Sequence, residues 1–280
     1  MTTAPIAVTG STGRLGGRVA TRLAAAGVAQ RLLVRDPARA PRLPGAGVVV
    51  ASYADGEAVR RALDGIATAL MVSAAEAPDR VDEHRTFVDA AAAAGVQHLV
   101  YVSFVGAAPD ATFTLARDHW ATEQHIRDLL PAATFLRDDL YSDFFPAMVG
   151  ADGVIRGPAG DGRVAAVAQD DVADVAAAVL RAPAGHAGAT YDLTGPEALT
   201  LTEVAGTLTA VTGRRVTYHP ETVEEAYASR AGYGAPAWQV DAWVSTYTAI
   251  AAGEMAAVST AVADLTGHSA RTPAQVLEVG

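Results

Sequence analysis

Three glycines near the start of the chain, Gly10, Gly13 and Gly16, have the spacing of a phosphate-binding turn. They stand between a short apolar run, Ile6-Ala7-Val8, and a stretch that repeats apolar residues at helical intervals. In such a strand–turn–helix unit, the first glycine permits the sharp turn and the second lets the backbone approach a pyrophosphate. The third lets the helix pack closely on the strand. Strand, glycines and helix in this order predict a dinucleotide site.

The expected helix begins with Arg14 and Leu15, directly beside Gly16. A helix N-terminus offers free N–H groups and the positive end of the helix dipole, and both favour a bound phosphate. We therefore include these first-turn residues among the cofactor-binding positions.

A cation, Arg35, follows the second expected strand, residues 30–34. In dinucleotide folds the residue just past this strand meets the adenine ribose. An acid there binds the 2′-hydroxyl of NAD, whereas an arginine suits the extra phosphate of NADP. Arg14 could supply a second charge, but Asp36 could bind a ribose hydroxyl instead. We predict that NADP(H) is preferred over NAD(H).

Small polar residues follow three further expected strands, at residues 48–50, 66–72 and 97–102. Ser52 stands where adenine would lie, Ser73 and Ala74 stand where a cofactor would pass close to the backbone, and Ser103 lies at a strand tip. Ligands of open α/β sheets bind at the carboxyl ends of the strands, so these positions are candidate cofactor contacts.

His119 lies on the apolar stripe of an expected helix that begins at Thr114. Its side chain points either into the core or toward a cofactor. A histidine on such a stripe is more often a core residue whose ring nitrogens are hydrogen-bonded within the protein. His119, Glu123 and His125 could suggest a metal, but only the first two share a helix face, so we predict no metal site.

Acidic and aromatic residues both follow the sixth expected strand, residues 132–137. Tyr141, Phe144 and Phe145, with Trp238 further on, would form the wall of a pocket for an organic substrate. The same pattern is equally typical of an amphipathic helix that turns its aromatic side chains to the core.

Strands and helices alternate strictly over the first 150 residues, which predicts an α/β fold with a Rossmann-type, doubly wound parallel sheet. We expect residues 1–150 to form the nucleotide-binding domain. Residues 151–280 turn glycine-rich and then show expected helices at 170–180, 202–211 and 223–229 and strands at 189–193 and 214–219. They show no convincing separate core, so we expect a smaller C-terminal α/β lobe that packs on the first domain and covers the substrate.

The composition excludes several classes of protein. The net charge of -10 argues against nucleic-acid and anionic-membrane surfaces. No apolar run approaches the ~20 residues of a membrane span. The chain has no cysteine, which excludes thiol catalysis and fits a cytoplasmic location. All 21 basic residues are arginine, which excludes phosphate-loop NTPases and lysine Schiff-base enzymes.

The chain resembles the NmrA-like group of atypical short-chain dehydrogenases/reductases, and in particular the branch that includes type-two NAD(P)H:quinone oxidoreductases. The resemblance runs nearly end to end. The stretches that carry it are TGSTGRLG at 9–16, LVRDP at 33–37, YVSFVGA at 101–107, ARDHWATEQHI at 116–126, TFLR at 134–137, DDVADVA at 170–176, YDLTGP at 191–196 and GHSARTP at 267–273.

The resemblance implies phosphate contacts at Gly10, Thr12, Gly13 and Gly16, an adenosine-phosphate contact at Arg35, and nicotinamide-side contacts near Ser73 and Ser103. The larger superfamily's Tyr-x-x-x-Lys pair falls here on Leu115 and His119, so the usual proton donor is missing. A similar histidine in the quinone-reductase branch would sit by the nicotinamide ribose.

Three functions therefore stay open. The first is an NADPH-dependent reductase of quinones or other small conjugated carbonyls, with His119, Tyr141 and Ser103 as candidate catalytic residues. The second is a regulator that senses NADP(H) without turnover. The third is a reductase of a specialised metabolite such as an imine or a cyclic ether. We expect a small-molecule substrate and no nucleic-acid or membrane partner, and a homodimer is left open.

Overall fold

The structure, a computed structural model, describes residues 5–279 of the chain. The chain folds into two compact units, and each unit is built from separate stretches of sequence. Unit 1 consists of Met1–Ser103, Trp120–Arg137 and Val172–Tyr191, and unit 2 of Phe104–His119, Asp138–Asp171 and Asp192–Gly280. The expected boundary at residue 150 stays a prediction.

A seven-stranded sheet forms the centre of unit 1, in the order β3-β2-β1-β4-β5-β6-β9. The pairs β1–β2, β1–β4, β2–β3 and β4–β5 are parallel, as predicted. The strands are β1 (Ile6–Val8), β2 (Gln30–Val34), β3 (Ala46–Val50), β4 (Thr68–Val72), β5 (His98–Phe104), β6 (Thr134–Asp138) and β9 (Thr190–Leu193). The strand order reverses between β1 and β4, which is the switch point where such sheets bind ligands.

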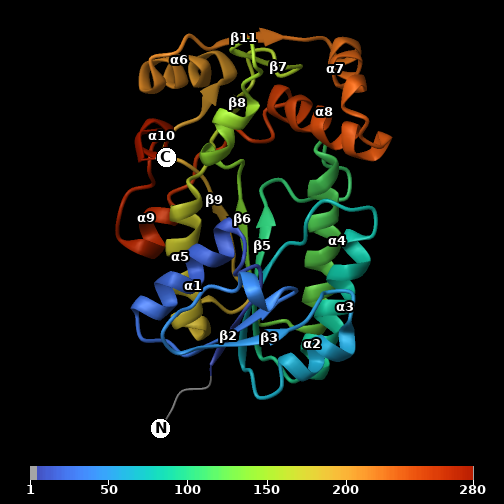
Figure 1. The fold of residues 1–280 in the computed structure, drawn as a ribbon, viewed down its shortest axis with the longest axis vertical. Helices are drawn as coiled ribbons and strands as arrows, with labels where there is room; N and C mark the ends of the chain where they lie inside the picture. The colour runs from blue at the N-terminus through green and yellow to red at the C-terminus, as the bar shows by residue number, and fades with distance from the viewer. Residues whose placement is uncertain (1–4, 280) are drawn as a thin grey trace. The chain divides into compact units, whose positions relative to one another are not determined.

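Helices cover both faces of this sheet. The helices α1 and α5 lie on one side, and α2, α3 and α4 lie on the other (Figure 1). They are α1 (Arg14–Ala25), α2 (Gly56–Ala62), α3 (Arg80–Ala93), α4 (Thr114–Leu129) and α5 (Gln169–Arg181). The fold prediction of a doubly wound α/β sheet is confirmed.

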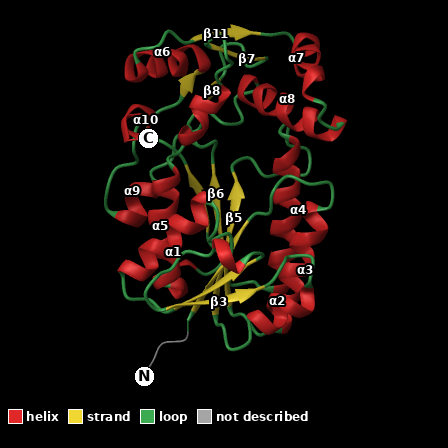
Figure 2. Cartoon of the chain, viewed as in Figure 1, coloured by secondary structure: helices red, strands yellow, loops and turns green. Residues whose placement is uncertain are grey.

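Unit 2 is mainly helix and loop with short strands (Figure 2). Its strand β7 (Val154–Gly157) pairs in parallel with β11 (Thr217–Pro220), and β8 (Arg163–Val164) pairs antiparallel with β10 (Leu199–Thr200). Its helices are α6 (Leu201–Thr212), α7 (Val223–Arg230), α8 (Ala237–Ala251), α9 (Ala261–Thr266) and α10 (Pro273–Val279). Complete capping boxes start α6 at Thr200 and α7 at Thr222.

Each unit has a hydrophobic core of its own. Phe87, Tyr101 and Phe135 belong to the core of unit 1, whereas Phe113 and Phe145 belong to that of unit 2. The unit 2 core draws on stretches from both sides of residue 150, such as Phe113 and Ile155, and the expected C-terminal lobe stays a prediction. Within residues 5–279, no helix combines the length and the apolar character needed to cross a bilayer.

Candidate functional site

The glycine turn joins β1 to α1 and borders a cavity of about 240 Å³ in unit 1. Gly10 has a φ of +65°, a conformation that favours glycine, and its carbonyl accepts the Gly13 N–H at 2.9 Å. A Cβ at Gly16 would overlap the Gly10 carbonyl and would lie 2.7 Å from the Thr9 oxygen. The first turn of α1 contains no acidic residue. These features fit a diphosphate held by backbone amides.

Six of the predicted cofactor residues line this cavity, namely Gly10, Thr12, Arg35, Ser52, Ser73 and Ala74. Gly13 and Arg14 are exposed at the start of α1, while Leu15 and Gly16 are buried in its first turn. For these four residues a contact with the cofactor would run through the backbone or, for Arg14, through its exposed guanidinium.

Arg35 and Asp36 have different surroundings. Arg35 is exposed and lines the cavity, directly after β2. Asp36 is the N-cap of a short helical turn, and its carboxylate accepts the Ala38 N–H at 2.9 Å. Because this carboxylate is already used locally, the alternative in which Asp36 binds a ribose hydroxyl loses support.

Tyr53 also lines the cavity, and its hydroxyl ties two strand ends together. It donates to the Val72 carbonyl at 2.7 Å and lies 2.5 Å from the Thr9 hydroxyl, which in turn accepts the Val72 N–H at 2.9 Å. Since the Tyr53 proton goes to Val72, the Thr9 hydroxyl donates to Tyr53. Burial raises the pKa of Tyr53 and keeps it neutral. Tyr53 is not among the cofactor-binding residues predicted from the sequence, although its neighbour Ser52 is.

The loop after β4 is held by two side chains of α3. The Ala74 N–H donates to His84 Nε2 at 2.8 Å, and the Ala74 carbonyl accepts from Arg80 Nε at 3.0 Å. His84 Nδ1 therefore carries the ring proton and donates to the Thr122 hydroxyl at 2.9 Å. Burial lowers the pKa of His84 to about 3, so the ring is neutral at ordinary pH. Periodicity could not single out this histidine, because its role depends on a backbone group ten residues away.

Ser103 is fully buried, and its hydroxyl donates to Glu123 at 2.6 Å. Glu123 is also fully buried and forms two hydrogen bonds with Arg137, at 2.8 and 2.7 Å. The buried carboxylate is thus satisfied by a charge-assisted, two-point contact. These contacts give Ser103 a structural partner, and a role for Ser103 in cofactor binding or catalysis stays a prediction.

His119 and Tyr141 belong to unit 2. His119 is 6% exposed, and its ring centroid lies 6.2 Å from that of Phe104. The Tyr141 hydroxyl donates to the Asp138 carboxylate. Burial, together with the Asp138 charge, raises the pKa of Tyr141 well above its ordinary value. Tyr141 is therefore a poor source of a proton while it is bonded to Asp138.

A second cavity, of about 530 Å³, lies within unit 2, and we name it the aromatic cavity. Its aromatic lining residues are Phe144, Tyr233, Trp243 and Tyr247. Of the predicted substrate residues, only Phe144 is among them. Phe145 is 1% exposed in the unit 2 core, which does not support a substrate contact. Trp238 is absent from this lining as described, while Trp243 on the same helix is present.

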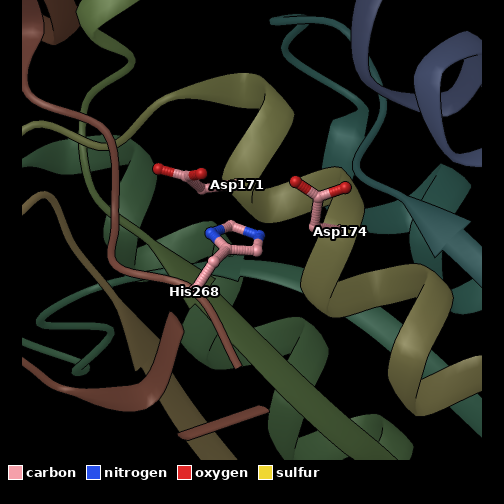
Figure 3. A group of neighbouring side chains, drawn as sticks. All are labelled: Asp171, Asp174 and His268. Carbon is pink, nitrogen blue, oxygen red and sulfur yellow. The ribbon is translucent and has the colours of Figure 1, made fainter. Parts of the chain in front are cut away.

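Three side chains drawn in Figure 3, Asp171, Asp174 and His268, have the residue types of a metal site. Asp171 is in an ion pair with Arg271 and also accepts the Arg271 N–H at 2.7 Å. Asp174 accepts from Arg22 Nε at 2.5 Å. Each carboxylate thus has an arginine partner, and the three residues are divided between the two units. We assign no metal to them.

The sequence profile of the NmrA-like family matches residues 2–235 of the chain. This chain belongs to the NmrA-like family. It is 35% identical to quinone oxidoreductase 2 of Escherichia coli over 277 residues, which cover 96% of each protein. It is 32% identical to NAD(P)H azoreductase of Xenophilus azovorans, again with 96% of each chain covered. It is 38% identical to the (4-alkanoyl-5-oxo-2,5-dihydrofuran-3-yl)methyl phosphate reductase of Streptomyces griseus, with 95% of this chain and 94% of that protein covered.

Solved structures of the family agree with this placement. The NADPH complex of the E. coli quinone oxidoreductase QOR2 matches with a TM-score of 0.89 and 34% identity, covering 98% of this chain and 99% of that chain. The NADP(H) complex of the Citrobacter triphenylmethane reductase matches with a TM-score of 0.85 and 32% identity, covering 97% and 98%. The negative transcriptional regulator NmrA with NADP, at 19% identity and a TM-score of 0.76, shares the fold.

Proposed function

We propose that this protein is an NADPH-dependent reductase that transfers a hydride to a quinone or another small conjugated carbonyl. The observation that carries the proposal is the glycine turn and Arg35 at one cavity, in a chain whose full-length relatives include a quinone oxidoreductase. The relatives that reduce azo compounds, triphenylmethane compounds and an unsaturated furan phosphate support a conjugated acceptor.

In this proposal the cofactor is held largely by the backbone. Amides of the turn from Gly10 to Gly16 bind the diphosphate, and Arg35 binds the adenosine phosphate. Ser52 and Tyr53 contact the adenosine end, while Ser73 and Ala74 lie along the remainder of the nucleotide. The bound dinucleotide supplies the hydride, and the chain supplies its orientation.

The acceptor needs little acid catalysis from the chain. A dihydroquinone oxyanion is a weak base that water can protonate, so the missing tyrosine–lysine pair is compatible with this reaction. His119 or Tyr141 would hydrogen-bond the acceptor oxygen. Tyr141 can do so only when its hydroxyl proton leaves the Asp138 carboxylate, to which it is donated in this structure. Ser103 would act by positioning α4 through Glu123.

The test is oxidation of NADPH by the purified protein with simple quinones, followed by the loss of nicotinamide absorbance. Oxygen is excluded, because reoxidation of the product would otherwise inflate the rate. We expect acceptor-dependent oxidation that is faster with NADPH than with NADH. The absence of acceptor-dependent oxidation across quinones, enones, azo compounds, imines and cyclic ethers would overturn the proposal.

The second candidate function is a regulator that binds NADP(H) and a protein partner without turnover. The observation in its favour is that Leu115 and His119 occupy the positions of the superfamily's tyrosine and lysine. Saturable NADP(H) binding without oxidation of NADPH would favour the regulator. We also propose a cytoplasmic location, a C-terminal part that covers the substrate, and a homodimer.

A further inference from the structure

The aromatic cavity of unit 2 has the size and the lining of a site for a small organic molecule. Its volume of about 530 Å³ falls within the range usual for ligand pockets. Four rings contribute to the wall, and the two charged lining residues are Arg156 and Arg230. No carboxylate is among the lining residues that the structure describes. The cavity therefore combines flat apolar surface with two guanidinium groups, whose partner carboxylates Asp152 and Glu221 are not among the lining residues.

Two of the four rings are exposed enough for a ligand to contact them. Phe144 is 55% exposed and Tyr233 is 73% exposed. The Tyr233 ring meets Trp243 edge to face, with centroids 6.1 Å apart, which fixes the direction that the indole presents. Exposed rings held in defined orientations suit a planar conjugated body, because aromatic pairs prefer offset or edge-to-face contacts.

Arg230 is part of the frame of the cavity. Its guanidinium is paired with Glu221 at 2.9 Å and donates to the Arg156 carbonyl at 3.0 Å. It also lies 5.2 Å from the centre of the Tyr247 ring. Both members of the ion pair are buried, so breaking it would leave a buried charge without compensation. Arg230 thus holds β7, α7 and α8 together.

Arg156 is the cation that a ligand can reach. Its side chain is 40% exposed, and its partner Asp152 is 53% exposed at 2.6 Å. Exposed ion pairs contribute little to stability, so an anionic ligand can take over one edge of this guanidinium at small cost. The planar guanidinium donates in pairs to carboxylate-like oxygens.

We infer that the aromatic cavity binds a small organic anion, with a planar conjugated body stacked on its rings and the anionic group on Arg156. The inference goes beyond the proposed function, because the described lining includes no cofactor-binding residue and neither His119 nor Tyr141. Neutral analogues bind through the rings alone.

The test is calorimetric binding to the full chain saturated with NADP, which avoids turnover. The ligands are menadione, which is neutral, and a sulfonated naphthoquinone of similar shape. The chain has no cysteine and no lysine, so quinone adducts on these side chains do not complicate the measurement. We expect the sulfonated ligand to bind more tightly to the unaltered protein.

Arg156→Gln should weaken the sulfonated ligand about ten- to hundredfold and menadione less than about threefold, because only the former loses a charge-assisted contact. Tyr233→Ala should weaken both ligands alike. Arg163→Gln is the matched control, since Arg163 forms a comparable exposed pair with Glu203 in the same unit but does not line the cavity.

Equal affinity for the two ligands, or an Arg156→Gln variant that behaves like Arg163→Gln, would overturn the inference. The two proposals fail separately. Charge-selective binding without NADPH oxidation would contradict the reductase alone, whereas oxidation with no effect of Arg156 would contradict the cavity inference alone.

Discussion

Arg35 and Asp36 are adjacent in sequence but make different contacts. The arginine faces the cavity, while the aspartate caps a turn. This division is the physical basis for a preference for the phosphorylated cofactor.

Arg35→Asp should weaken binding of NADP by ~1.5–3 kcal/mol, or about one to two decades, and should change NAD far less, because only NADP loses a charge-assisted contact. Isothermal titration with both nucleotides measures this. Arg39→Asp, an equal charge change on an exposed residue outside the cavity lining, serves as the control. Equal losses for both nucleotides would show that Arg35 does not touch the 2′-phosphate.

His84 positions the loop after β4 through one backbone bond. His84→Ala should lower the free energy of unfolding by about 1–3 kcal/mol, because it leaves the Ala74 N–H without its acceptor. It should also weaken NADPH binding, since Ala74 lines the cavity. Urea unfolding and titration with NADPH measure the two effects.

His84→Gln is the conservative variant, because its side-chain oxygen can accept the Ala74 N–H. His125→Ala is the control, since His125 lies at the surface of the same unit and pairs with Asp89. If His84→Gln binds NADPH as poorly as His84→Ala, the lost acceptor is not the cause.

Asp139 is a buried carboxyl whose Oδ2 has no hydrogen-bond partner among the described residues. Burial raises its pKa to about 7, and the neighbouring Asp192 adds to the shift. Between the ordinary pKa near 4 and this value, the folded state holds a proton that the unfolded state has lost. The free energy of unfolding therefore falls as the pH rises through this window.

Asp139→Asn removes the cost of ionising a buried carboxyl, because the asparagine side chain stays neutral at every pH. At about pH 8 the variant should be more stable than the unaltered protein by roughly 1–4 kcal/mol, and at about pH 4 the two should be similar. Urea unfolding at several pH values measures the difference. The exposed Asp110→Asn should show no such trend. A stability difference for Asp139→Asn that does not depend on pH would contradict the raised pKa.

At the scale of elements, α1 packs closely against the glycine turn because residue 16 has no side chain. Gly16→Ala places a methyl group against the Gly10 carbonyl, so α1 must move away. We expect a loss of about 1–3 kcal/mol in the free energy of unfolding and weaker NADPH binding.

Gly206→Ala in α6 is the matched control for this change. Its Cβ would meet nothing within 4 Å, so alanine should stabilise the helix by about 1 kcal/mol. Thermal melting with and without NADPH compares the two variants. A Gly16→Ala protein that is as stable and binds as well as the parent would contradict the close packing of α1.

The elements of unit 1 could be predicted because buried strands appear as short apolar runs and amphipathic helices repeat apolar residues every three or four positions. The two-residue strands β8 and β10 could not, because a period needs more than two residues to be seen. Trp238 and Trp243 show a related limit. Five residues apart on α8, they lie on different faces, and the sequence does not say which face borders the cavity.

At the scale of the whole molecule, the chain enters unit 1 three times, so no contiguous half of the sequence contains it. A fragment of residues 1–150 lacks Val172–Tyr191, which includes most of α5. Val175 and Val179 of this helix are fully buried, so the fragment would expose the face of the sheet that α5 covers.

We expect the 1–150 fragment to aggregate or to melt without a cooperative transition, because the part of the sheet that α5 covers becomes exposed. A fragment of residues 1–195 restores α5 and β9 and should retain more structure. Circular dichroism on heating and size-exclusion chromatography compare them. Cooperative melting of a monomeric 1–150 fragment would instead support a domain boundary at residue 150.

The sequence contains no lysine, so its 21 strongly basic side chains, from Arg14 on α1 to Arg271 near the C-terminus, are all guanidinium groups. A guanidinium does not lose its proton in proteins, so the ion pairs around Glu123 and Glu221 keep their positive member in alkaline solution. It also resists acylating reagents that modify amines. Because the sequence contains no lysine, amine-directed acylation leaves every one of these ion pairs intact.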